Sequence, residues 1–209
     1  TDVVFDGQYV RLSDERAARE QNRYLTLRDF ANLCVKNIAG GDALTSHASA
    51  CLPVSPPPFM AGIAEVEVDT LTGLCRLTAF TAAHDVGKAI NPELCRGQVG
   101  SALQQGMGLV FCEQVKIDPK TGQPLNATLQ RYHVARACDF PHIETVLVEN
   151  GSPEGPYGAK SIGESCFVPV APALLAAVND ALQTDLTPLP LTPEKIIRAV
   201  QEKRKEASL

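Results

Sequence analysis

A glycine-rich loop that ends in a carboxylate is the feature of this sequence best suited to chemistry. Residues 155–164 read Gly-Pro-Tyr-Gly-Ala-Lys-Ser-Ile-Gly-Glu and lie between an expected strand and an expected apolar helix. The helix dipole and free backbone amides near a helix start favour the charged form of Glu164. Burial against a cofactor would instead favour the uncharged form of this carboxylate. The sequence therefore predicts a basic but ionised carboxylate, as a general base requires.

The loop alone also admits a purely structural interpretation. Glu164 can simply cap its helix, while the glycines only turn the chain. A phosphate-binding P-loop is not favoured, because that motif places lysine directly after its glycine, whereas Ala159 separates Gly158 from Lys160.

A second candidate is the segment 97–108, which carries glutamine and glycine where an ordinary amphipathic helix has leucine and alanine. Gln98 can both donate and accept hydrogen bonds, which suits a polar cofactor. A buried glutamine satisfied by neighbouring backbone is the alternative. The segment contains four glycines, Gly97, Gly100, Gly106 and Gly108. Each costs a helix about 1 kcal/mol relative to alanine, which predicts that another group packs close to this backbone.

Other polar residues are better explained by structure than by chemistry. His84 and Asp85 could suggest a metal pair, but the four histidines (47, 84, 133 and 142) have no ligand spacing. We expect a histidine at a strand end and an aspartate in a turn. The acidic residues Glu65, Glu67 and Asp69 alternate along an expected strand and predict a solvated face.

The elements that must position these residues fall into two regions. A proline-rich connection at 53–58 separates an N-terminal region, 1–52, from a C-terminal region, 53–209, that carries Glu164. The first region is predicted to contain a hairpin that turns at Asp6-Gly7. A helix should follow, begin near Thr26 with a capping box, and stop at Gly40-Gly41.

The second region is predicted to alternate hairpins and helices. Its expected elements are a hairpin of Gly62–Asp69 and Leu74–Ala83, a helix from Asn91-Pro92 to about Phe111, strands Gln114–Ile117 and Ile143–Glu149, an apolar helix from about Phe167 to Leu182 and a last helix opened by Thr192-Pro193-Glu194. The predicted fold class is α+β, with mixed sheet hairpins and packed helices.

The composition limits the classes of function. With 209 residues, 44% hydrophobic and 21% charged, the chain can bury a sizeable core. A net charge of −5 gives no bulk attraction to nucleic acid or anionic lipid. No apolar run approaches the roughly 20 residues of a spanning helix, and the seven cysteines form no C-x-x-C pair. We expect a cytoplasmic protein with reduced thiols that binds neither nucleic acid nor membrane.

Taken together, these segments resemble the molybdopterin-binding region of the xanthine dehydrogenase and aldehyde oxidase family. Four stretches match in the same order: Ala64 to Asp69, Asp85-Val86-Gly87 with Asn91-Pro92, Gly97-Gln98-Val99 through Gly106-Met107-Gly108, and Ala159 through Glu164. The segment Leu191 to Ile196 is similar to the family's closing motif. The resemblance implies that the chain is the C-terminal part of a larger molybdopterin-binding domain.

The resemblance also implies roles for particular residues. Glu164 corresponds to the family's catalytic glutamate, and Gln98 to the glutamine that contacts the molybdenum centre and its pterin. Cofactor contacts are implied as well for their neighbours, Gly97, Lys160, Ser161 and Gly163. The implied chemistry is hydroxylation, in which Glu164 takes a proton from a molybdenum-bound hydroxyl group whose oxygen attacks an electron-poor carbon.

The implied cofactor is molybdopterin with molybdenum, in its plain or cytosine dinucleotide form. The 2Fe-2S clusters and FAD of the family are expected on partner subunits, because this chain has no motif to bind them. The substrate would be an N-heteroaromatic compound, such as a purine (xanthine or hypoxanthine) or nicotinate. The family's molybdenum subunit is several times longer. The chain is therefore expected to be one part of a split subunit, with the remainder as a separate chain, or a fragment.

The sequence also departs from the family pattern. Gly100 stands where the family's helix usually has an acidic residue, and His133 and Ala135 stand where lysine and proline are common. Three alternatives stay open on the sequence: a non-catalytic assembly subunit, an aldehyde-oxidising member of the same family, and a free-standing domain that binds a small molecule.

Overall fold

The structure is a computed structural model that describes residues 3–13, 24–36, 47–49, 51 and 54–206. The chain divides into two compact units, Thr1–Cys51 and Leu52–Leu209. Gly40 and Gly41, which the sequence predicts as a helix stop, lie outside the described residues.

The first unit contains a small antiparallel sheet and one helix. Strands β1 (Val3–Phe5), β2 (Tyr9–Leu12) and β3 (Tyr24–Thr26) pair in that order, and helix α2 covers Leu27–Val35. The turn between β1 and β2 is held by the Asp6 carboxylate, which accepts hydrogen bonds from two backbone N–H groups, and by Gly7 at φ 93°. The Thr26 hydroxyl caps α2 by accepting from the backbone N–H of Asp29 at 3.1 Å. The predicted hairpin and helix start are confirmed, whereas β3 was not predicted.

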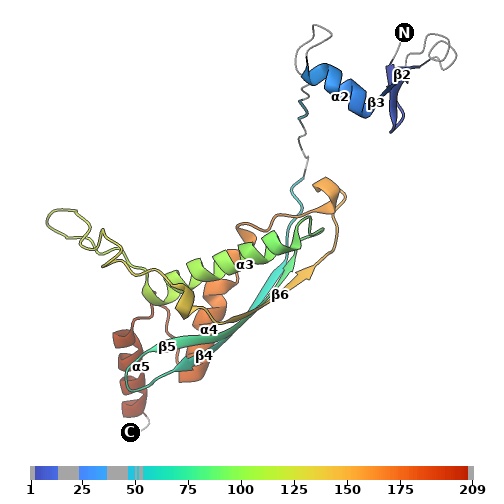
Figure 1. Cartoon of the computed structure of the whole chain (residues 1–209). Coiled ribbons are helices and arrows are strands. Elements are labelled where there is room, and N and C mark those ends of the chain that lie inside the picture. The colour runs from blue at the N-terminus through green and yellow to red at the C-terminus, as the bar shows by residue number, and fades with distance from the viewer. Residues whose placement is uncertain (1–2, 14–23, 37–46, 50, 52–53, 207–209) are drawn as a thin grey trace. The chain divides into compact units, whose positions relative to one another are not determined.

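The second unit is built on a three-stranded sheet. Its strands are β4 (Met60–Val68), β5 (Cys75–Asp85) and β6 (His142–Val148), in the order β4-β5-β6 (Figure 1). The β4–β5 hairpin is antiparallel, as predicted, and its outward side chains include exposed Glu65 and Glu67. Strand β6 was predicted as an element, but the sequence did not indicate that it pairs parallel with β5.

Three helices accompany this sheet: α3 (Pro92–Met107), α4 (Val170–Leu182) and α5 (Pro193–Glu206). The Asn91 side chain caps α3 by accepting from the backbone N–H of Leu94 at 3.1 Å, and a π-helical turn, Gly108–Cys112, follows the helix. The predicted start of α4 at Phe167 was wrong. Pro169 has no N–H with which to continue a helix, so Ser165–Phe167 forms a separate 3-10 turn before α4 begins.

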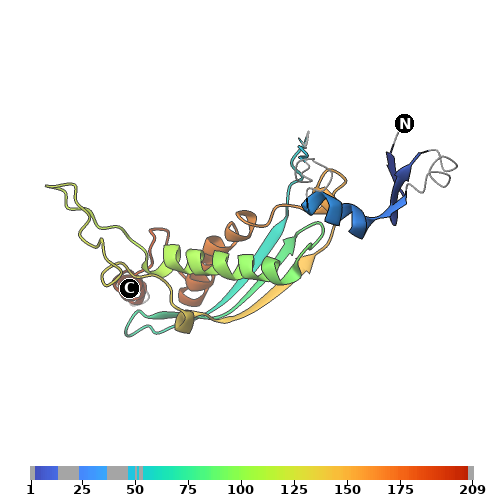
Figure 2. The same cartoon turned by 45° about the horizontal axis from the view of Figure 1, so that its top comes forward.

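The core lies where the sheet, α3, α4 and α5 meet. Its largest fully buried side chains include Phe80, Leu103, Leu174, Leu191 and Ile196. Helix α3 runs along the length of the sheet (Figures 1 and 2). Among the described residues, Ser165–Leu182 alone has the length and apolar composition of a membrane span, but Val170, Leu174 and Val178 on this stretch are buried in the core. The α+β fold class is confirmed.

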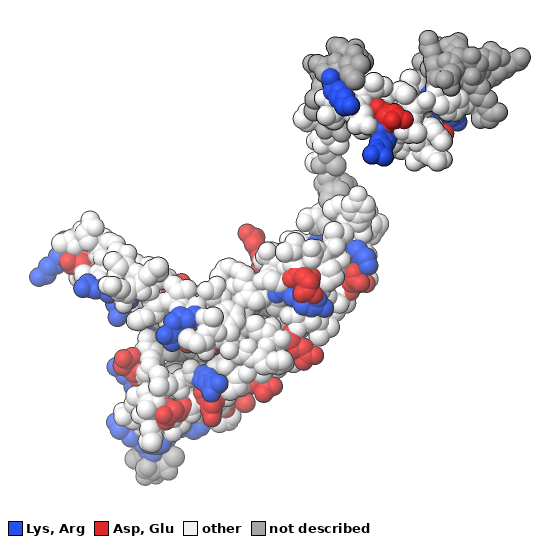
Figure 3. Space-filling view, in the orientation of Figure 1, with Lys and Arg blue, Asp and Glu red and all other residues white. Residues whose placement is uncertain are grey.

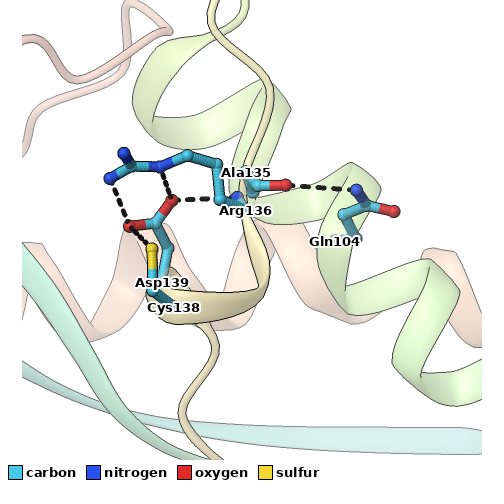
Figure 4. Close-up of polar contacts among 5 residues, drawn as sticks. All are labelled: Gln104, Ala135, Arg136, Cys138 and Asp139. Carbon is cyan, nitrogen blue, oxygen red and sulfur yellow. Dashed lines mark hydrogen bonds and ion pairs between the residues drawn. The ribbon is translucent and has the colours of Figure 1, made fainter.

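The segment 113–136 departs from the sequence prediction. Gln114–Ile117 is not a strand: a single bridge joins Ile117 to Pro124, and the segment projects away from the sheet beyond α3 (Figures 1 and 2). Its base is tied to α3, because the Gln104 side chain donates to the carbonyl oxygen of Ala135 at 3.1 Å (Figure 4). Immediately beyond, the Arg136 guanidinium forms two hydrogen bonds with the Asp139 carboxylate, which fix the 3-10 turn Ala137–Asp139 (Figure 4). Alternation of residue types indicated a strand here, but no neighbouring strand pairs with the segment.

Candidate functional site

The two segments singled out by the sequence meet at one cavity. Gln98 on α3 and Glu164 on the glycine-rich loop both line a hollow of about 460 Å³. Its other lining residues are Ser101, Ala102, Gln105, Gly163, Phe167 and Val168. Residues at spacings of three, four and seven share one face of a helix. Residues 98, 101, 102 and 105 therefore form one wall, and the loop with its following turn forms the other.

The Glu164 carboxylate is not used to cap a helix. Glu164 precedes the 3-10 turn Ser165–Phe167, but its side chain makes no capping hydrogen bond, and the residue is exposed in this chain. Helix α4 begins only at Val170. Since the dipole of a helix acts mainly within its first turn, α4 contributes little at Glu164. The capping interpretation is wrong, and the predicted effect of the helix start on this carboxylate is weakened.

Gln98 presents its side chain to the cavity while its backbone is anchored. The residue is exposed, and no described residue hydrogen bonds with its side-chain amide. Its carbonyl oxygen lies 3.4 Å from the Cys166 thiol, which also lies 3.2 Å from the carbonyl oxygen of Gly163. Cys166 is buried, and burial raises the pKa of its thiol, so that the thiol stays protonated and able to donate. The amide of Gln98 is therefore available to a ligand, and the alternative of a backbone-satisfied glutamine is not seen.

Lys160 is held in a buried ion pair. Its ammonium nitrogen lies 2.7 Å from Asp85 Oδ2, and each side chain is only 9% exposed. The hydrogen bond from Lys160 is the largest cause of the lowered pKa of Asp85, and burial acts against it. The ion pair joins the end of β5 to the glycine-rich loop. Lys160 and Gln98 also border a smaller hollow of about 220 Å³.

The remaining predicted site residues differ in whether they border the main cavity. Gly163 borders the main cavity, whereas Ser161 and Gly97 do not. The Ser161 carbonyl oxygen accepts a hydrogen bond from the Ser165 hydroxyl at 3.1 Å, which tightens the loop before the 3-10 turn. A Cβ added at Gly97 would meet nothing within 4 Å in the described structure.

The four glycines of the α3 region divide into two pairs. A Cβ at Gly106 would collide with the Val170 side chain, and one at Gly108 would collide with the Glu113 carboxylate. The prediction of close packing is confirmed there. At Gly97 and Gly100 it is wrong for the described residues, because nothing lies within 4 Å of an added Cβ.

Sequence reasoning missed two polar residues of the cavity, Ser101 and Gln105. Their distance from Gln98 along the helix was the available signal, because spacings of three and seven place residues on one face. The structure also shows His84 at the end of β5, where burial lowers the pKa of its imidazole. The expected strand-end position of His84 and turn position of Asp85 are seen, but neither ring nitrogen of His84 has a hydrogen-bond partner among the described residues.

On the face shown in Figure 3, acidic and basic side chains of the second unit are interspersed. No described group of three or more His, Cys, Asp or Glu residues is placed to hold a metal ion directly.

Comparison with known proteins identifies the family. Residues 3–141 match the family described as the molybdopterin cofactor-binding domain. The putative xanthine dehydrogenase molybdenum-binding subunit XdhA of Escherichia coli (strain K12) is 32% identical over 180 residues, which cover 85% of this chain and 24% of that protein. The probable hypoxanthine oxidase XdhD of the same organism is 37% identical over 164 residues, which cover 78% of this chain and 17% of that protein.

A solved structure supports the same conclusion. Quinoline 2-oxidoreductase from Pseudomonas putida 86 superposes with a TM-score of 0.68 at 28% identity, covering 96% of this chain and 26% of that one. The chain belongs to the molybdopterin cofactor-binding domain family, and its resemblance to the xanthine dehydrogenase family of molybdenum hydroxylases is confirmed. It spans about a quarter or less of the length of these relatives. The family match includes Gln98 and ends before Glu164.

The residues of the cavity fit a molybdopterin cofactor. Two glutamine amides, a serine hydroxyl and a carboxylate border it, and such groups hydrogen bond readily with a polar organic ring system. A metal carried by its own organic ligand needs no protein cluster of histidine or cysteine. The open helix surface at Gly97 and Gly100 leaves room for a bulky group beside Gln98.

Proposed function

We propose that this chain supplies the general base, and one wall of the cofactor site, of a molybdenum hydroxylase that acts on an N-heteroaromatic substrate. The supporting observation is that Glu164 and Gln98 line the same cavity although they lie 66 positions apart in the sequence. A purine such as xanthine or hypoxanthine, or nicotinate, is the proposed substrate class. The names of XdhA, XdhD and quinoline 2-oxidoreductase all refer to nitrogen heterocycles.

The proposed roles of the residues follow from the chemistry of their side chains. The molybdenum cofactor, when bound, supplies the two-electron oxidation. Glu164 accepts a proton at a carboxylate oxygen, since it is free of capping bonds and faces the cavity. Gln98 holds the cofactor through its side-chain amide, with Ser101 and Gln105 as further hydrogen-bond partners on the same wall.

The loop and helix backbone complete this wall. Gly163 borders the cavity, and a Cβ added there would lie 4.0 Å from the side-chain oxygen of Gln98. Gly97 and Ser161 flank the two segments and are proposed to approach the cofactor through their backbone. Phe167 and Val168 supply apolar surface to the lining of the cavity.

The proposed setting is a cytoplasmic complex of several subunits. The region 53–209 is the proposed catalytic part of this chain. The parts of a molybdenum subunit that the given sequence does not include are proposed to close the cavity over Glu164. Partner subunits would carry the 2Fe-2S clusters and FAD through which electrons leave. The cofactor is proposed to be molybdopterin in its plain or cytosine dinucleotide form.

The test is the substitution Glu164→Gln in the assembled enzyme. This change removes the proton acceptor with almost no change in volume, so kcat should fall by about 10²–10⁴-fold, the usual contribution of a general base. Molybdenum content and subunit assembly should stay unchanged. The matched control is Glu67→Gln, because Glu67 is an exposed carboxylate on β4 away from the cavity. Near-normal turnover in Glu164→Gln would exclude the proposed function.

A further inference from the structure

We propose that the buried ion pair between Asp85 and Lys160 is a strut that holds the Glu164 loop, residues 155–164, in its working position. Both residues would act on catalysis through the placement of Glu164, and neither would contact the cofactor. This inference deepens the proposed function and depends on it for the role of Glu164. It assigns Lys160 a positioning role in place of the cofactor contact that the family resemblance implies.

The contacts of Asp85 fix one end of the strut. Its backbone N–H donates to the carbonyl oxygen of Phe59 at 2.8 Å, and its Oδ1 accepts from the backbone N–H of Gly87 at 3.0 Å. Its other carboxylate oxygen, Oδ2, meets the Lys160 ammonium at 2.7 Å. Asp85 is the last residue of β5, the central strand of the sheet. The carboxylate is therefore anchored at the end of the central strand of the sheet.

The contacts of Lys160 fix the other end. Its backbone N–H donates to the carbonyl oxygen of Val86 at 2.9 Å, so the residue is bound to the same turn by main chain and side chain. Lys160 precedes Glu164 by four residues. On the other side of Glu164, the Cys166 thiol joins the carbonyl oxygens of Gln98 and Gly163. Glu164 is thus held between an attachment to β5 and an attachment to α3.

Close backbone packing supports the same attachment. Gly87 has φ 65°, and a Cβ placed there would collide with the carbonyl oxygen of Gly158 and lie 2.9 Å from the Lys160 side chain. The carbonyl oxygen of Gly158 also accepts from the backbone N–H of Ser152 at 3.1 Å. The loop therefore lies directly on the turn that follows β5.

Burial argues against a direct cofactor contact by Lys160. Both side chains of the pair are 9% exposed. An ammonium group that turned toward a ligand would leave the Asp85 carboxylate buried without its countercharge, which is strongly unfavourable. Lys160 is absent from the lining of the cavity that Gln98 and Glu164 share, and the hollow that it borders together with Gln98 is the smaller one, which Glu164 does not border.

The experiment compares Asp85→Asn, Lys160→Met and the double variant in the assembled enzyme. Each single change removes one charge, and the double change removes both, so that no buried charge is left unpaired and the protein can fold even if a single variant does not. Three quantities are measured: backbone hydrogen exchange of residues 155–164, molybdenum content, and kcat and KM separately.

The strut predicts the same response from both single variants. Exchange in residues 155–164 should rise, and kcat should fall by about 10²-fold, the cost typical of a misplacement of roughly 1 Å. KM and molybdenum content should stay within about twofold of the parent, because the contacts that bind the substrate equally in its ground state and transition state are not lost. The double variant should be no worse than the poorer single variant, since both changes remove one interaction.

Two further variants sharpen the result. Lys160→Arg keeps a cation against Asp85 and should restore part of kcat and of the protection from exchange. Lys88→Met is the matched control, because it breaks an ion pair with Glu149 at 3.0 Å that joins the same turn to the end of β6 but is 57% and 43% exposed. Exposed pairs contribute little, so all measured quantities should be unchanged.

The contrary outcomes are distinct. If Lys160 contacted the cofactor directly, Lys160→Met would lower molybdenum content, while Asp85→Asn would leave it and kcat near normal. Unchanged exchange in residues 155–164 in the charge-removing variants would also overturn the strut, whatever their turnover. Full turnover in Glu164→Gln would instead overturn the proposed function. The strut would then be tested by the hydrogen exchange of residues 155–164 alone.

Discussion

The two halves of helix α3 contain the same residue types and use them differently. Toward its C-terminal end, a Cβ added at Gly106 would collide with the Val170 side chain. A Cβ added at Gly108, which follows the helix, would collide with the Glu113 carboxylate. Toward its N-terminal end, Gly97 and Gly100 face open space, beside a glutamine whose amide has no partner among the described residues. Glycine thus serves internal packing in one half. In the other half it leaves an open surface, which under the proposed function lies beside the cofactor.

The largest effect expected from this comparison is that of Gly106→Ala. The added Cβ would collide with Val170 on α4, and overpacking of this kind usually costs about 1–3 kcal/mol of folding free energy. Denaturant unfolding of the purified protein measures the loss. The matched control is Gly97→Ala, which places the same methyl group in open space on the same helix. Equal destabilisation by both changes would remove the distinction between the two halves.

A smaller effect, of opposite sign, is expected for Gly100→Ala. Nothing lies within 4 Å of an added Cβ, so the gain in helix propensity should stabilise the chain by about 0.5–1 kcal/mol. In the assembled enzyme the same methyl group would occupy space beside the cofactor and lower molybdenum content. Thermal unfolding and metal analysis check the two parts. A variant with unchanged metal content would show that this surface serves another purpose.

The smallest effect concerns acid stability beside the C-terminal half of α3, where Arg136 holds Asp139. The hydrogen bonds from Arg136 lower the pKa of Asp139 from 3.8 to about 2. Because the folded state binds the proton less readily, the pair stabilises the fold above about pH 4, and this contribution is lost as the pH falls toward 2. Acid unfolding should therefore be less steep over this interval in Asp139→Asn than in the parent. Identical acid-unfolding profiles of the parent and Asp139→Asn would show that the pair does not contribute to stability in this interval.

Local signals in the sequence were sufficient for the elements whose boundaries are set by neighbouring residues. Asp6-Gly7 predicted the first hairpin, and Asn91-Pro92 predicted the start of α3, because a turn and an N-cap depend on side chains within a few positions. The alternation of residues in β4 and β5 likewise predicted their hairpin.

Features that depend on distant parts of the chain could not be predicted in this way. Periodicity does not specify a partner strand, so the parallel pairing of β6 and the unpaired state of Gln114–Ile117 were both missed. The ion pair of Lys160 joins residues 75 positions apart, and no local pattern indicates it. Residue chemistry marked Gln98 and Glu164 as candidates, and the family resemblance implied their roles. The structure added that both side chains line one cavity.

The most direct test of the central claim is a structure of the assembled enzyme with its cofactor bound. The account predicts that the Gln98 amide lies within hydrogen-bond distance of the cofactor, and that the Glu164 carboxylate faces the reactive ligand of the metal at a similar distance. A cofactor bound elsewhere, with the Glu164 carboxylate directed into bulk solvent, would contradict it.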